Sequence, residues 1–351
     1  MKKSIFIIFA LYNSFCFSQI LKDTLNGKVK TIYDEIIFHN KEHNLPKLLT
    51  EEGDFGHSAM LFPNSIWKNA VQSWYYTKSI AYIKSKKTYN KDGFPTREII
   101  YNLKGKILKD FSSNYDKNNN LIQFKENNNV RNYTYNSKNK LSTYLRYSIE
   151  EPNSYNYDLF VYNKKDSLVK IKEYTEEGLI FKTTYRYKNL SKKVFISSHL
   201  NMEFLEKECF FDKKDRIIKI VQYQGGFYES DTVKPKINYI IKKKYKKHLL
   251  IQITKSYTYD SIFSIEKFFY DKNDRIKKKQ ISTHNSKKSN WNIQFHYDNF
   301  NNITRTILTE NKNVYIIDFK YVFDKQNNWV KLTKFINGKK LYSWKRKIKY
   351  F

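Results

Sequence analysis

The sequence is poor in cysteine and contains no long apolar run. Its two cysteines are Cys16 and Cys209, and the first lies in an N-terminal segment that we expect to be removed. Cys209 alone cannot form an internal disulfide, and its apolar neighbours predict a small buried residue. No later segment reaches the roughly 18 apolar residues of a membrane-spanning helix. Packing and backbone hydrogen bonds must therefore hold the fold together.

Residues 1–18 have the features of a secretory signal peptide. Two lysines open the segment, an apolar run from Ile5 to Leu11 follows, and we expect cleavage after Ser18. Phe15 is too bulky a neighbour for Cys16 to be the lipid-bearing cysteine of a lipoprotein. We therefore expect an exported protein, in the periplasm, at the cell surface or outside the cell, with no transmembrane segment in the mature chain.

The chain also lacks the motifs of the common enzyme classes. It has no nucleophile elbow, Walker loop or dinucleotide fingerprint. Residues 39–43 have the His-x-x-Glu-His spelling of one metalloprotease class, but Pro46 follows closely and no third ligand is marked. The recurring acids, such as Asp116, Asp271 and Asp298, already have a role in turns. We expect no enzymatic activity, and we assign no catalytic residue, cofactor or metal.

One short pattern recurs nine times: an aromatic residue, Asp or Asn, two free positions, Gly, Asn or Asp, a polar position, then an apolar residue. Tyr115 to Leu121 is one copy. The Asp or Asn side chain can accept a hydrogen bond from the backbone N–H two residues on, which opens a turn. Gly, Asn and Asp adopt positive φ at the lowest cost. The expected positive-φ positions are Gly93, Gly105, Asn119, Asn139, Asp166, Asp215, Asp274, Asn301 and Asn327.

Apolar residues alternate before the turns, as in Phe295 with Tyr297 and Tyr321 with Phe323. Each copy therefore predicts a strand, a tight turn and a second strand. We predict an all-β fold: an extended antiparallel β-sheet of repeated hairpins, which can stay open, curve or close in part. We divide the chain into a signal peptide (1–18), a loop-rich N-terminal region (19–88) and a hairpin-repeat array (89–351).

The copies resemble the YD repeats of Rhs-type proteins. The shared signature is Tyr-Asp-x-x-Gly-Asn-x-Leu, which is best kept in residues 115–121, 297–303 and 323–329. The resemblance covers about residues 89 to 351, and the opening residues 25–30 look like those of short exported members from Bacteroidetes-type bacteria. It implies a β-repeat fold without catalytic residues in the repeats. Glycine is kept only in the first two copies. The spacing between copies varies from 12 to 34 residues when weaker ones at Tyr174, Tyr187 and Tyr245 are included.

The chain has 65 basic and 34 acidic residues, a formal charge of +31, and 17% aromatic residues. This balance favours an anionic partner, such as an acidic polysaccharide or another envelope component. Nucleic acid is not expected, because the chain is exported and its basic residues are 57 Lys against 8 Arg. A second interpretation is that the charge reflects amino-acid composition and solubility alone. The candidate anion-binding residues are Lys242, Lys243, Lys244, Lys246 and Lys247.

Together these features predict an exported, non-enzymatic repeat protein that provides a binding or structural surface. Two other functions stay open at this stage. One is a shortened Rhs-like component of a toxin or antagonism system. The other is a hydrolase whose site the sequence does not mark. The sequence specifies neither the ligand nor the oligomeric state.

Overall fold

The structure is a computed structural model that describes residues 25–39, 84–101, 105–198, 203–224, 236–258, 263–284, 290–310 and 312–351. These residues form 22 β-strands and no helix, and so no helix in them has the length and hydropathy to cross a membrane. The expected signal peptide and most of the N-terminal region lie outside the described residues. The predicted all-β antiparallel fold is confirmed.

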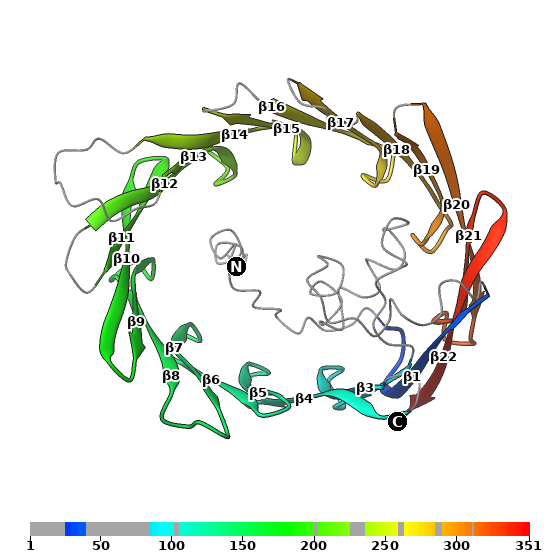
Figure 1. Cartoon of the computed structure of the whole chain (residues 1–351), viewed down its shortest axis with the longest axis horizontal. Coiled ribbons are helices and arrows are strands. Elements are labelled where there is room, and N and C mark those ends of the chain that lie inside the picture. Colours follow the sequence, from blue (N-terminus) through cyan, green and yellow to red (C-terminus); the bar gives the residue numbers. More distant parts are fainter. Residues whose placement is uncertain are drawn as a thin grey trace. The chain divides into compact units, whose positions relative to one another are not determined.

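The strands follow one another closely along the chain (Figure 1). They are β1 (Val29–Phe38), β2 (Lys84–Tyr89), β3 (Pro95–Tyr101), β4 (Ile107–Tyr115), β5 (Leu121–Glu126), β6 (Asn129–Tyr135), β7 (Leu141–Ser148), β8 (Tyr155–Tyr162), β9 (Leu168–Thr175), β10 (Gly178–Lys188), β11 (Ser191–Ser198), β12 (Glu203–Phe211), β13 (Ile217–Tyr223), β14 (Ile237–Lys246), β15 (Leu249–Tyr257), β16 (Phe263–Tyr270), β17 (Ile276–His284), β18 (Trp291–Tyr297), β19 (Ile303–Glu310), β20 (Asn313–Phe323), β21 (Trp329–Ile336) and β22 (Lys339–Tyr350).

The chain forms two compact units. Unit 1 comprises the described residues up to Asp110 together with 320–334 and 340–351, and unit 2 comprises 111–319 and 335–339. In unit 2 every strand pairs antiparallel with the next one along the chain, from β4 with β5 to β19 with β20. Unit 2 is therefore an uninterrupted meander of neighbouring hairpins.

In unit 1, β1 lies between two strands from opposite parts of the chain. It pairs antiparallel with β22 on one side and with β2 on the other, and β2 continues to β3. Strand β21 contacts β22 through the edge-to-face pair Trp329 and Trp344, whose ring centroids lie 5.8 Å apart. Both β1 and β2 come largely from the part of the chain that the sequence assigned to a loop-rich N-terminal region.

The repeated turns whose Asx residue the structure describes all close in the same way. Asp116 donates its N–H to the carbonyl of Asn120, and its Oδ1 accepts bonds from the N–H groups of Asn118 and Asn120 at 2.8 Å. The pairing register shifts by one residue beside the turn, as in a bulged hairpin. The nine predicted turn positions all have positive φ, from 57° to 81°. The same side-chain bonds recur at Asn90, Asn136, Asn163, Asp212, Asp271, Asp298 and Asp324.

A tyrosine hydroxyl joins each of several hairpins to the one before it. Tyr135 Oη donates to the carbonyl oxygen of Leu121 at 3.0 Å, the first residue of the preceding strand. That carbonyl lies beside the register shift, where the regular ladder is interrupted. The aromatic column of the repeat is therefore part of the hydrogen-bond scaffold. The same bond is made by Tyr162, Tyr187, Tyr245, Tyr270 and Tyr297.

Candidate anion-binding surface

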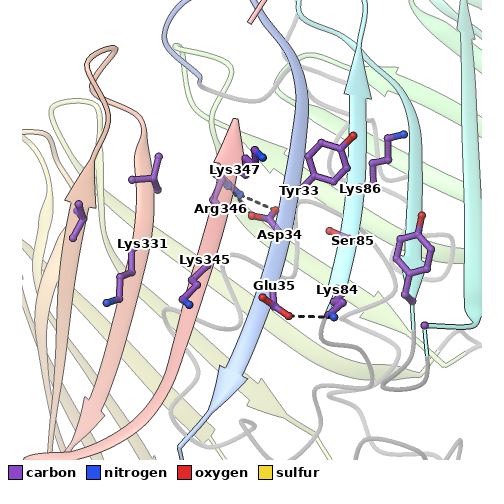
Figure 2. A pocket seen from close by; sticks show the side chains of 14 residues that line it. Tyr33, Asp34, Glu35, Lys84, Ser85, Lys86, Lys331, Lys345, Arg346 and Lys347 are labelled. Atoms are coloured by element: carbon purple, nitrogen blue, oxygen red, sulfur yellow. Dashed lines mark hydrogen bonds and ion pairs between the residues drawn. The ribbon is translucent and has the colours of Figure 1, made fainter. Parts of the chain in front are cut away.

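A shallow, open concavity of about 940 Å³ lies on unit 1. Its walls come from β20, β21, β22, β1, β2 and the end of β3, and Figure 2 shows its charged side chains. We define the β1 surface as the lining residues Tyr33 and Glu35 on β1, Lys345 and Lys347 on β22, and Lys84 and Lys86 on β2, together with the adjacent Lys349 on β22, whose ammonium group lies near the Tyr33 ring.

Strand alternation places these side chains on one face of the sheet. Tyr33 and Glu35 are two residues apart, and Asp34 between them points to the other face. The register sets Tyr33 opposite Lys347 on one side and Lys86 on the other. Glu35 in turn lies opposite Lys345 and Lys84 in the same registers. The lysines therefore flank β1 in two rows.

Sheet geometry gives the spacing of these rows. Lysines two residues apart on one strand are separated by about 7 Å, and the rows on β22 and β2 lie about 10 Å apart across β1. Tyr33 is 36% exposed. The Nζ atoms of Lys86 and Lys349 lie 5.6 and 5.8 Å from the centre of its ring. An extended polymer chain can therefore lie along β1, with ammonium groups on both sides.

The β1 surface is strongly positive. Its one carboxylate, Glu35, pairs with Lys84 at 3.3 Å, and both side chains are about half exposed. None of Lys345, Lys347 and Lys349 has an ion pair with a described residue. Positive charges of this region also act on the nearby His39. Partial burial lowers its pKa, and so do Lys340, Lys331 and Lys345.

The opposite face of the same strands is neutral and packed. Arg346 donates two hydrogen bonds to the carboxylate of Asp34, at 2.9 and 3.1 Å, and both side chains are 13% exposed. The guanidinium carbon also lies 3.8 Å from the centre of the Trp329 ring. The arginine of this region thus has a structural role, and lysines carry the charge that faces solvent.

The lysine run predicted as an anion site does not converge in the structure. Lys242, Lys244 and Lys246 are exposed along one face of β14, whereas Lys243 points to the other face. Lys247 lies in the following turn with a φ of 54°, and its carbonyl accepts a hydrogen bond from Arg216. Three of the five lysines therefore share a surface.

The other candidates from the sequence have ordinary surroundings. His39 Nε2 lies 2.9 Å from Ser343 Oγ, and the remaining residues of its motif lie outside the described part of the chain. No cluster of three metal-ligating side chains occurs among the described residues. Cys209 is buried and unpaired, and burial raises the pKa of its thiol.

The sequence analysis missed a pair of acids in unit 2. Asp158 on β8 lies directly opposite Glu173 on β9, and Asp158 is only 9% exposed. Burial, followed by the charge of Glu173, raises the pKa of Asp158 to about 7. Burial and Glu206 raise the pKa of Glu173. Neither residue lines the concavity of unit 1.

Comparison with known proteins gives distant likenesses. No protein-family model matches the chain, and no curated protein matches it. The structure is similar to part of a Photorhabdus luminescens Tc holotoxin pore, with 9% identity over 71% of this chain and 14% of that one, and a TM-score of 0.41. It is also similar to part of a TcdB2-TccC3-TEV structure, with 9% identity over 74% of this chain and 15% of that one, and the same TM-score.

A porin-like protein from Bacteroides uniformis is similar at 12% identity, over 65% of this chain and 91% of that one, with a TM-score of 0.27. This chain thus spans 14 and 15% of the two toxin chains. Similarities this distant give no information about the function of this chain. The relation to Rhs-type proteins stays a prediction from the sequence motif.

Proposed function

We propose that this protein is an exported, non-enzymatic β-sheet protein that binds anionic polymers of the cell envelope on its β1 surface. The observation that carries the proposal is the array of five lysines around one carboxylate on the same face of three adjacent strands. Ammonium groups near one another raise the local concentration of a polyanion and strengthen its binding.

The arrangement differs from a lysine run on a single strand, because its lysines lie on two strands on either side of β1. Some lysines elsewhere in the sheet pair with acids, as Lys279 does with Glu266 at 2.8 Å and Lys138 with Asp166 at 2.8 Å, whereas the exposed Lys242, Lys244 and Lys246 of β14 have no ion pair with a described residue. On β22 the three lysines of the β1 surface have no such partner among the described residues. Like charges left unpaired on adjacent strands cost stability, and an anionic ligand would remove that cost.

The proposal is tested by measuring the binding of polygalacturonate and inorganic polyphosphate to the wild type and two double variants. We expect the double variant Lys345→Ala with Lys347→Ala to lower the affinity for both polymers by about tenfold at low salt. The control, Lys242→Ala with Lys244→Ala, removes the same charge from β14 and should cost less than about twofold. Equal losses in the two variants would show that the β1 surface has no special role.

Export is a separate part of the proposal. Its support is the basic and apolar pattern of residues 1–18. We expect the mature protein in the periplasmic, surface or medium fraction, with an N-terminal sequence that begins at Gln19. Recovery of the uncleaved chain in the cytoplasm would contradict this part and leave the binding test unaffected.

A further inference from the structure

We infer that the β1 surface selects acidic polymers that also carry hydroxyl groups, which means acidic polysaccharides rather than polyphosphates. This inference rests on the proposed function and narrows its ligand. It depends on two side chains that lie between the lysine rows and are not cationic, Glu35 and Tyr33.

Glu35 is the first of these side chains. Its side chain is 42% exposed, and its ion pair with Lys84 uses Oε1, which lies 3.3 Å from Lys84 Nζ. A carboxylate has about four acceptor positions, so Glu35 keeps capacity for donors from a ligand. A sugar hydroxyl can donate to it. A polyphosphate chain has only acceptor oxygens at neutral pH, and it would meet charge repulsion at this point.

Tyr33 is the second. It presents an aromatic ring and a hydroxyl group between the two lysine rows (Figure 2). Its ring offers an apolar surface to the C–H face of a sugar, and its hydroxyl can donate or accept a hydrogen bond. Val322 and Val330 add apolar lining on the far side of β22. A phosphate chain has no apolar face that could use these contacts.

The lysines complete the site without favouring phosphate. A lysine ammonium is a flexible point charge, whereas arginine offers the planar fork that matches phosphate and carboxylate in two bonds. The one arginine among the lining residues, Arg346, already binds Asp34 on the opposite face. Acid groups that project to either side of a polysaccharide chain can therefore each reach an ammonium on β22 or β2.

The test compares polygalacturonate with inorganic polyphosphate of matched charge by isothermal titration calorimetry, and uses single-stranded DNA as a third ligand. We expect the wild type to prefer polygalacturonate. Tyr33→Ala should lower the affinity for polygalacturonate by about fivefold and change the affinity for polyphosphate by less than about twofold. Tyr33→Phe should retain most of the affinity for polygalacturonate. Glu35→Gln should lower the ratio of the affinity for polygalacturonate to the affinity for polyphosphate by about threefold or more, because the repulsion between Glu35 and phosphate is removed.

The outcomes separate this inference from the proposed function. If the double variant of Lys345 and Lys347 weakens both polymers but neither Tyr33→Ala nor Glu35→Gln changes their ratio, the inference is wrong and the proposed function stands. A wild type that prefers polyphosphate or DNA leads to the same conclusion. If the double variant binds both polymers as the wild type does, the proposed function itself fails. Thermal melts of each variant check that the fold is intact.

Discussion

At the scale of single residues, the fold depends on one polar side chain per turn. Asp116 Oδ1 accepts two backbone N–H groups that the bulged turn leaves without strand partners. Partial desolvation raises the pKa of Asp116, but the hydrogen bonds from Asn120 and Asn118 together lower it by more, so that the net shift is downward. The residue three positions later, at positive φ, is Gly, Asn or Asp in all nine copies of the repeat.

Among the described non-glycine residues with positive φ, Lys247 is the one that is neither Asn nor Asp. It has a φ of 54° although lysine has no side-chain bond that favours this conformation. We expect Lys247→Asn to stabilise the protein by roughly 0.5 kcal/mol, because Asn adopts positive φ at lower cost. Lys246→Asn, one residue earlier in β14, should not stabilise it, because Asn is disfavoured in strands. Denaturant unfolding of both variants gives the comparison, and a gain in both would contradict the explanation.

The acid pair of unit 2 gives a prediction about pH. The pKa of Asp158 is raised to about 7, so the folded state keeps a proton that the unfolded chain releases near pH 4. The free energy of unfolding must therefore fall as the pH rises from about 4 to about 7. Asp158→Asn should reduce this slope to the part that Glu173 contributes, and be more stable than the wild type at pH 8, by on the order of 2 kcal/mol.

Stability curves from pH 4 to pH 8 test this prediction. The exposed Glu177→Gln, in the turn after β9, is the matched control and should keep the slope of the wild type. The explanation fails if Asp158→Asn and Glu177→Gln follow the same curve, or if the wild type gains stability toward pH 8.

These residues show what the sequence can reveal. The turn positions could be predicted because a turn is local, and its Asx and positive-φ residues stand three apart in the chain. The acid pair and the β1 surface could not, because each depends on which strands become neighbours. Lys345, Lys347 and Lys349 alternate visibly, as Lys84 and Lys86 do, but nothing local indicates that β1 lies between them.

At the scale of strands and hairpins, the tyrosine hydroxyl ties one hairpin to the next. Tyr162 Oη donates to the carbonyl of Leu141 at 2.9 Å. Burial raises the pKa of this tyrosine, which keeps the hydroxyl protonated as a donor. The aromatic residue that opens the motif therefore links each such hairpin to the strand before it. From the sequence, these aromatic residues are predicted only to lie in strands.

We expect Tyr162→Phe to lower the free energy of unfolding by about 1 kcal/mol, since the ring is kept and one hydrogen bond is lost. Tyr155→Phe, at the other end of β8, is the control. The hydroxyl of Tyr155 makes no hydrogen bond to a described residue, and its loss should cost less than about 0.5 kcal/mol. Chemical denaturation measures both values, and equal costs would mean that the hydroxyl bond contributes nothing to stability.

At the scale of the whole molecule, the two units differ in how their strands are joined. In unit 2 each strand pairs with its neighbour in the chain, whereas in unit 1 β1 pairs with β22, about 300 residues away. Closing such a distance costs more chain entropy than closing a hairpin. The ion pair of Asp34 with Arg346 lies in this long-range contact.

Asp34→Ala should therefore weaken unit 1 selectively. It leaves the largely buried Arg346 without the carboxylate of Asp34. We therefore expect the free energy of unfolding to fall by about 2 to 3 kcal/mol. Hydrogen exchange should become faster in β1 and β22 and stay unchanged from β5 to β19. Asp110→Ala breaks a more exposed ion pair with Arg97 and should cost less than about 1 kcal/mol. Uniformly faster exchange in both units would contradict the expectation that the loss is confined to unit 1.

The bonds between successive turns have a consequence for how such a gene changes over time. Arg275 of one turn reaches Asn301 of the next at 2.9 Å, and Asn120 reaches Asn139 in the same manner. Each partner lies in the adjacent copy, so a duplicated or deleted strand pair changes these contacts only at the new junction. We therefore expect recombination within the gene to lengthen or shorten unit 2 in steps of two strands where the turn residues that meet at the junction can pair.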